Sequence, residues 1–250
     1  TRTIANPDVG LRYTQRDADK DFSVLSSRDT AGALVLVPQT YFTGYATSQV
    51  ASTATDARAN FRLGSLSLGA VLTDRQYAQG VGYNRVAGPD FVWQIDRNQL
   101  MRAQVLMSTT NAQMNAQGNL ARANTTNGHA AYFDWSRGND AWGMSVNVRD
   151  FSKDFRADNG FFSQVGFRSI NSEVTKKFGR TGVLNEFNTY ISAEYKVDSE
   201  GNVLSKILTA GVRIAGPFDS SAYLNLSPTV SSRVNQDGEV FSIARIAGGW

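Results

Sequence analysis

The stretch from Arg156 to Gly160, with the sequence RADNG, combines charged, amide and flexible residues in the most unusual pattern of the chain. If Arg156, Asp158 and Asn159 face an aqueous interior or its mouth, they can contact a polar solute. A structural explanation is favoured, in which Asp158 and Asn159 form an Asx-type turn and Gly160 takes a positive φ. Arg156 then bridges a carboxylate such as Asp150 or Asp154.

Two patterns that could support hydrolysis are incomplete. Four carboxylates, Asp134, Asp150, Asp154 and Asp158, could supply a glycosidase pair, but their spacing along the chain does not fix their separation in space. The single histidine, His129, would need a serine two residues further on to act as in an outer-membrane phospholipase, and that position is Ala131. The chain also lacks the Gly-x-Ser-x-Gly elbow of many hydrolases. No catalytic residue is predicted.

The sequence predicts no metal site and no cofactor. Asp17, Asp19 and Asp21 have the spacing that opens a calcium loop, but the sixth position is Phe22 instead of glycine and the twelfth is Arg28 instead of glutamate. A solvated hairpin turn is the better prediction for these aspartates. The chain has no cysteine and one histidine, which excludes disulfides, thiol catalysis and multi-histidine metal sites.

Four charged residues are candidates for the lining of a hydrated interior. Arg12, Arg149, Arg213 and Glu194 fall on small or polar faces of expected strands. A simpler role is also open, in which each arginine pairs with Glu194 or an aspartate to fill the interior. The total of 25 basic against 22 acidic residues gives a net charge of +3, too small an excess to predict nucleic-acid binding.

The elements that must position these residues are strands. Apolar and polar residues alternate in segments of about eight to twelve residues, and roughly ten to twelve such segments can be counted. The alternation is clearest in five segments: Val9 to Tyr13, Leu66 to Leu72, Trp142 to Val148, Phe187 to Val197, and Ala222 to Leu226. The segments Ala31 to Val37 and Val203 to Ala215 are also strand-like. No helical periodicity is evident, so the chain is predicted to be all-β.

The segments between strands are of two kinds. Short polar turns are predicted at residues 17–21, 138–140, 198–202 and 235–238. Longer connections are predicted at residues 39–56, 77–90 and 111–127, the last as a flexible exposed loop. Short turns that alternate with long loops are typical of a meander with two unequal ends. No linker or internal repeat is evident, so residues 1–250 are expected to form a single domain.

Alternating strands fit either a soluble sandwich or barrel, or a transmembrane barrel whose apolar residues face lipid. The membrane alternative is favoured because the polar faces mix glycine, serine, asparagine, tyrosine and arginine. Aromatic residues also gather at strand ends, as in interfacial girdles: Phe91 and Trp93, Tyr132 to Trp135, Phe151 and Phe155, and Phe161 and Phe162. A mean hydropathy of −0.31 is ordinary for such barrels. The predicted fold is an antiparallel up-and-down transmembrane β-barrel, either complete or a truncated part of one.

Three stretches make the chain resemble a known family: Tyr83 to Phe91 (YNRVAGPDF), Asp150-Phe151, and Phe155 to Phe161 (FRADNGF). The family is a domain of unknown function that forms outer-membrane β-barrels, usually after a carbohydrate-binding domain resembling family nine. The resemblance covers residues 10–178 best, and the stretch RADNG followed by Phe161 is its most specific part. Two departures matter: the carbohydrate-binding domain is absent from these residues, and two glycines precede the terminal Trp250.

The resemblance implies the outer membrane of a Gram-negative bacterium, with membrane lipid and the barrel-assembly machinery as partners. The expected function is to pass or bind a polar solute such as a polysaccharide, or to anchor a periplasmic binding domain. Two alternatives stay open. The first is a barrel-anchored hydrolase that acts on glycans or lipids, and the second is a soluble all-β carbohydrate-binding module.

Overall fold

The computed structural model describes residues 7–30, 34–235 and 239–249. Within these ranges the chain forms strands joined by turns and loops and contains no helix, so the all-β prediction is confirmed. None of these residues forms a helix long and apolar enough to span a bilayer. The strands are β1 (Pro7–Arg16), β2 (Lys20–Asp29), β3 (Leu34–Pro38), β4 (Thr43–Thr47), β5 (Ser52–Leu63), β6 (Leu66–Tyr77), β7 (Gly82–Asp96), β8 (Gln99–Met114), β9 (Leu120–Gly138), β10 (Trp142–Phe151), β11 (Phe167–Thr181), β12 (Leu184–Asp198), β13 (Val203–Ala215), β14 (Ser221–Val234) and β15 (Val240–Gly249).

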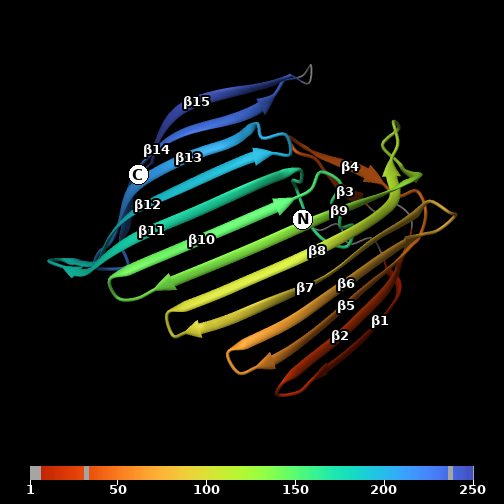
Figure 1. The fold of residues 1–250 in the computed structure, drawn as a ribbon, viewed down its shortest axis with the longest axis horizontal. Coiled ribbons are helices and arrows are strands. Elements are labelled where there is room, and N and C mark those ends of the chain that lie inside the picture. The colour runs from red at the N-terminus through yellow and green to blue at the C-terminus, as the bar shows by residue number, and fades with distance from the viewer. Residues whose placement is uncertain (1–6, 31–33, 236–238, 250) are drawn as a thin grey trace. The chain divides into compact units, whose positions relative to one another are not determined.

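Thirteen of these strands form one antiparallel sheet that follows the order of the sequence (Figure 1). The exception is the hairpin of β3 and β4, which is inserted between β2 and β5 and forms a sheet of its own. The up-and-down order that the sequence predicts is therefore confirmed. The predicted closure is not, because β1 and β15 stand at the two ends of the order and the sheet is open.

The strands are distributed over two compact units, which we describe separately. The first unit consists of Thr1–Trp93, Ala103–Ala131 and Asp150–Gly166. The second consists of Gln94–Arg102, Tyr132–Arg149 and Phe167–Trp250. The single domain expected from the sequence stays a prediction.

In the first unit, the register places apolar and polar residues on opposite faces of the sheet. Directly paired residues of antiparallel strands point to the same side. Leu68 of β6 is paired with Phe61 of β5 and with Phe91 of β7, so these three side chains share one face. The next residue, Gly69, is paired with Asn60 and Asp90, so these three residues lie on the opposite face. We call these the apolar face and the polar face.

The second unit has the same two faces. Ile191 of β12 is paired with Val174 of β11 and with Ala210 of β13 on the apolar face. The next residue, Ser192, is paired with Glu173 and Thr209 on the polar face. The alternation read from residues 187–197 therefore describes the strand correctly.

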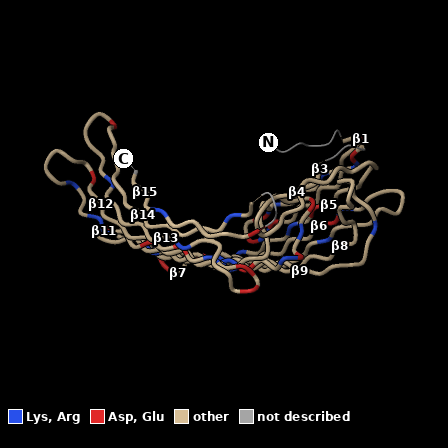
Figure 2. Tube along the Cα trace, turned by 90° about the horizontal axis from the view of Figure 1, so that it is seen from above, with Lys and Arg blue, Asp and Glu red and all other residues tan. Residues whose placement is uncertain are grey.

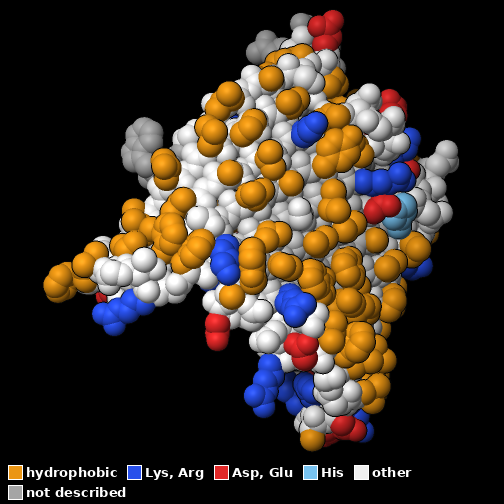
Figure 3. Space-filling view, turned by 60° about the vertical axis from the view of Figure 1, so that its left-hand side comes forward, with side chains coloured by type: hydrophobic (Ala, Val, Ile, Leu, Met, Phe, Trp, Pro, Cys, Tyr) orange, Lys and Arg blue, Asp and Glu red, His pale blue; other side chains and the backbone are white. Residues whose placement is uncertain are grey.

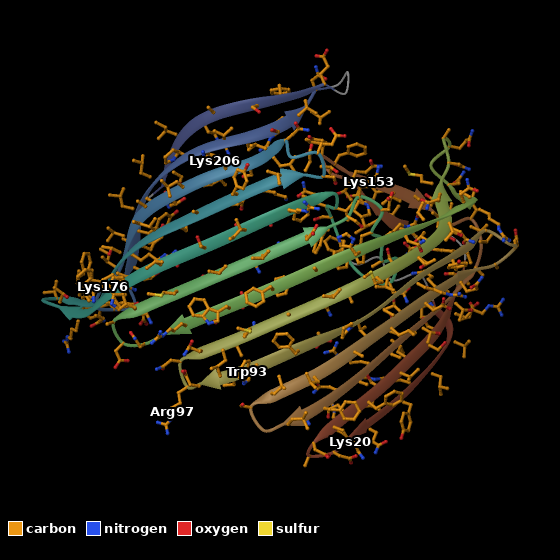
Figure 4. All side chains as sticks on the ribbon, in the orientation of Figure 1. Lys20, Trp93, Arg97, Lys153, Lys176 and Lys206 are labelled. Atoms are coloured by element: carbon orange, nitrogen blue, oxygen red, sulfur yellow. The ribbon has the colours of Figure 1, made fainter. Side chains whose placement is uncertain are left out.

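Turns of two or three residues lie at one end of the strands in the first unit, and turns of four or more residues and the long connections lie at the other. The turns at residues 17–19 and 64–65 are at one end, where Lys20 and Trp93 lie, and the connection that contains Lys153 is at the other (Figure 4). The two ends are thus unequal, as predicted. The predicted turns near residues 17–21, 138–140 and 198–202 are present, while the turn at 235–238 and the strand at 31–37 lie partly outside the described residues, and Trp250 lies wholly outside.

The three predicted long connections are wrong, because each contains strand residues. Residues 39–56 include β4 and the start of β5. Residues 77–90 contain a turn of four residues, 78–81, and otherwise belong to β6 and β7. Residues 111–127 contain a turn at 115–119 between the ends of β8 and β9, and Ala112 and Leu120 within them are buried. These stretches do not alternate clearly, because buried apolar residues such as Tyr77 and Val86 lie on the polar face.

The core of the first unit lies between the polar face and two segments that cover it. The β3–β4 hairpin contributes Val35 and Ala46 to a cluster with Tyr77, Ala112 and Leu120. Residues 152–166, which connect β10 to β11 and which we call the inserted segment, contribute Phe155 and Val165 to a second cluster with Val86, Leu106 and Ala130. The polar face at this end of the strands is therefore covered.

The inserted segment lies directly on the backbone of β9. A Cβ atom at Gly128 would be 2.3 Å from the backbone nitrogen of Phe155, which only a glycine permits. The Phe155 ring also packs edge-on against Phe162, with 5.1 Å between the ring centroids. The segment is thus packed closely against β9 and within itself, in addition to the polar contacts described next.

Candidate functional site

Arg156 and Asp158 form a buried ion pair within the inserted segment. The Arg156 Nε and Nη2 atoms donate to Asp158 Oδ1 and Oδ2 at 2.6 and 2.8 Å, and Nη1 donates to the Ala112 carbonyl oxygen at 2.5 Å. The side chains are 6% and 0% exposed, respectively. A bidentate pair of this kind is geometrically well suited to stability, provided that its remaining lone pairs and protons are satisfied.

The sheet beneath the segment satisfies these groups. Tyr77 at the end of β6 donates its hydroxyl to Asp158 Oδ2 at 2.6 Å. Asn84 of β7 accepts from the Asp158 backbone N–H at 2.8 Å and donates to the Arg156 carbonyl oxygen at 3.0 Å. Asn84 also donates to Thr110 of β8 at 2.6 Å. Three neighbouring strands therefore hold the segment through one hydrogen-bond network.

The network keeps the guanidinium charged. Burial by itself lowers the pKa of Arg156, but the carboxylate of Asp158 and its hydrogen bonds, together with Tyr77, more than offset this, so the pKa is raised. The positive charge of Arg156 is thereby fixed opposite the negative charge of Asp158. This arrangement positions a loop and leaves neither group available to a solute.

The contacts expected for the stretch RADNG differ from those in the structure. Arg156 binds Asp158, and the predicted bridge to Asp150 or Asp154 is not found. Gly160 does not have a positive φ, and its N–H closes a turn on the Ala157 carbonyl oxygen at 3.0 Å. Asn159 does not point to open solvent, because its Nδ2 donates to Asp56 Oδ1 of β5 at 3.0 Å.

The other four candidates lie on polar faces. Arg12 of β1 shares its face with Thr14, to which its Nε donates at 3.3 Å. Arg149 of β10 lies with its guanidinium carbon 5.9 Å from the Tyr132 ring centroid. Arg213 of β13 pairs with Glu173, not with Glu194, at 3.2 Å. Glu194 of β12 is half-buried. Arg12 belongs to the same unit as the Arg156–Asp158 pair, and the other three candidates belong to the second unit.

The sequence analysis missed a series of ion pairs on the polar face of the first unit. Arg58 of β5 reaches across β6 to Asp90 of β7, with 2.6 Å between Nη2 and Oδ1, and Gly69 lies directly beneath the pair. Arg75 of β6 binds Asp29 of β2 at 2.7 Å, and both side chains are about nine-tenths buried. Figure 2 shows basic and acidic residues close together in this region. The alternation of Arg58 with alanines at 57 and 59 is the signal that would have revealed this face.

The contacts of His129 and Asp158 are not those of a catalytic triad or a glycosidase carboxylate pair. His129 Nε2 is 3.7 Å from Asp150 Oδ1, but the nearby Ser152 hydroxyl donates to the His129 backbone carbonyl at 3.1 Å, so this contact does not involve the imidazole. Asp158, one of the four carboxylates considered, is fully buried in its ion pair. Among the residues that the structure describes, no group of three metal-ligating side chains comes together.

No family model and no curated protein matches the sequence. Among solved structures, the chain is similar to the crystal structure of the Pseudomonas putida toluene transporter TodX. The TM-score is 0.33 and the sequence identity is 10%, over 96% of this chain and 80% of that chain.

Proposed function

We propose that this chain is the wall of an outer-membrane β-barrel whose polar face lines an aqueous interior that binds or passes a polar solute. The observation that carries the proposal is the exposure of the apolar face. Leu11, Phe61, Leu72, Ile191 and Leu224 are 76%, 53%, 49%, 59% and 63% exposed. Figure 3 shows apolar side chains spread over much of one side of the molecule.

The exposure of the apolar face and the covering of the polar face fit a lipid environment better than water. In a soluble sheet the apolar face is the covered one, whereas in the first unit the polar face is covered, by the inserted segment and the hairpin. Contiguous apolar patches above a few hundred Å² are rare on soluble monomers. This arrangement favours the barrel over the soluble carbohydrate-binding module.

The apolar face has the dimensions and flanks of a membrane-spanning band. On β6, apolar residues follow at every second position from Leu66 to Leu72, and Asp74 and Gln76 then succeed them on the same face. At about 3.4 Å per residue, this run spans roughly 20 Å, close to the apolar band of roughly 25 Å in outer-membrane barrels. Trp93, which is paired with Leu66, lies at the end where an aromatic girdle is expected.

The short-turn end then faces the periplasm and the long connections face outward. Closure of the sheet in the membrane is part of the proposal, since unpaired strand edges are not tolerated in lipid. The inserted segment and the hairpin occupy part of the interior. Membership of the domain-of-unknown-function family, the barrel-assembly machinery as a partner and the anchoring of a periplasmic domain remain proposals.

Membrane fractionation of the native protein, followed by electrophoresis in detergent with and without boiling, tests the proposal. We expect the protein in the outer-membrane fraction and a change of mobility on heating. A soluble protein without a heat-dependent shift would contradict it. For the hydrolase alternative, turnover that is lost in Asp150→Ala or Asp154→Ala without unfolding would be the supporting result.

A further inference from the structure

A shallow hollow lies on the polar face of the second unit, near the start of β12, the end of β13 and the start of β14. Its volume is about 330 Å³, and Glu186, Asn188, Tyr190, Arg213, Ser221 and Tyr223 are among the residues that line it. The register aligns its central residues, because Arg213 is paired with Asn188 on one side and with Tyr223 on the other. An amide, a guanidinium and a phenol therefore stand in one row across three strands.

The guanidinium in this row is held in place. Arg213 Nη1 and Nη2 donate to the Glu173 carboxylate at 3.2 and 3.3 Å, and the guanidinium carbon lies 3.8 Å from the Tyr190 ring centroid. Tyr190 is itself fixed over Gly211, where a Cβ atom would approach its ring to 2.7 Å. The Arg213 side chain is still 47% exposed, so a fixed group retains N–H donors for a ligand.

The residues on either side of Arg213 supply two further kinds of contact. Tyr223 is 51% exposed and offers its ring to the hollow. Asn188 is 8% exposed and donates to Glu186, while its Oδ1 atom is buried without a hydrogen-bond partner. A buried acceptor without a partner costs free energy, and the Asn188 amide carries such an unsatisfied oxygen next to Arg213 in this row.

The charges around the hollow indicate which ligand fits. Arg213 and Lys177 on the polar face are balanced by Glu173 and Glu186, so neither an anion nor a cation is favoured. An exposed aromatic ring with a pre-positioned guanidinium, an amide and a carboxylate suits a ligand with a weakly apolar face and several hydroxyl groups. We propose that this hollow binds a neutral, hydroxyl-rich solute of the saccharide class.

The inference rests on the proposed function, because it places the solute site on the polar lining of the barrel. The test uses the full chain in detergent, after heat-dependent mobility has shown that it is folded. Binding is measured on an array of neutral and acidic oligosaccharides for the unaltered protein, Tyr223→Ala and Arg213→Lys. Tyr195→Ala is the matched control, since Tyr195 is a tyrosine of similar exposure, 46%, on the apolar face of the same unit.

We expect binding to at least one neutral oligosaccharide, weakened about tenfold in Tyr223→Ala and unchanged in Tyr195→Ala. Arg213→Lys should also weaken it, because an ammonium group cannot keep the bidentate and stacked geometry. No binding to neutral glycans, a preference for acidic ones, or equal effects of the two tyrosine substitutions would overturn the inference. A folded, heat-modifiable barrel that fails in this way would leave the proposed function standing.

Discussion

Asn84 of β7 and Asp158 of the inserted segment are joined by a 2.8 Å hydrogen bond from the Asp158 backbone N–H to the Asn84 side-chain oxygen. The two residues are 74 positions apart in the chain. Each belongs to one of the stretches on which the family resemblance rests, YNRVAGPDF and FRADNGF. The two stretches thus meet in space, and their contact fixes a loop on the polar face of the sheet.

The ion pair within this contact should dominate the stability of the inserted segment. Asp158→Ala leaves the Arg156 guanidinium buried without its partner and should cost about 3–5 kcal/mol of unfolding free energy. The double variant Arg156→Ala with Asp158→Ala should cost less than the sum of the single ones, because it leaves no unpaired charge. Urea unfolding in detergent measures this, with the exposed Lys153→Ala as control. Additive costs would contradict a coupled pair.

Alanine substitutions at three glycines should lower the stability of the protein by different amounts. Gly128→Ala places a Cβ atom 2.3 Å from the backbone of the inserted segment, so it should cost about 1–3 kcal/mol and release that segment to protease. Gly69→Ala meets only the mobile ends of Arg58 and Asp90, at 2.7 and 2.6 Å, and should cost less. Gly138→Ala meets nothing within 4 Å and serves as the control. Equal protease resistance of all three variants would show that the segment does not lie on β9.

Adjacent residues of β12 should differ sharply in their tolerance of charge. Ile191→Lys puts an ammonium group on the apolar face and should destabilise the membrane-inserted protein by roughly 2–4 kcal/mol if it lies near the bilayer midplane. Ser192→Lys places the same group on the polar face beside Glu173, where it should have little effect. The fraction of each variant that folds into vesicles measures the difference. The opposite order would mean that the faces are assigned the wrong way round.

The sequence predicts the strands where burial and lipid impose a two-residue period. Trp142 to Val148 and Phe187 to Val197 alternate because each has one apolar and one polar face, and both are strands. The predictions for residues 77–90 and 111–127 were wrong because these strands lack that two-residue period. They continue beyond the apolar band, where polar side chains bond to backbone groups and no alternation is required. Asn84 donates to the Arg156 carbonyl oxygen, Asn111 accepts from the Tyr83 N–H, and Thr126 donates to the Thr110 carbonyl oxygen.

The candidate site was found in part. Arg156, Asp158 and Asn159 stand out locally, but their partners Tyr77, Asn84 and Asp56 are 70 or more positions away in sequence. Spacing along the chain carries no information about such contacts. The bidentate pairing of Arg156 with a residue two positions on also depends on how the segment turns, which only the folded backbone determines.

The most direct test of the membrane account uses the absence of cysteine from the chain. Single cysteines on β6 at Leu68, Ala70 and Leu72, and at Ser67, Val71 and Thr73, can carry spin labels in vesicles. We predict access to oxygen, which partitions into lipid, at the first three positions and access to a water-soluble nickel complex or burial at the other three. Labels at Leu68, Ala70 and Leu72 that are open to the nickel complex instead would contradict the account.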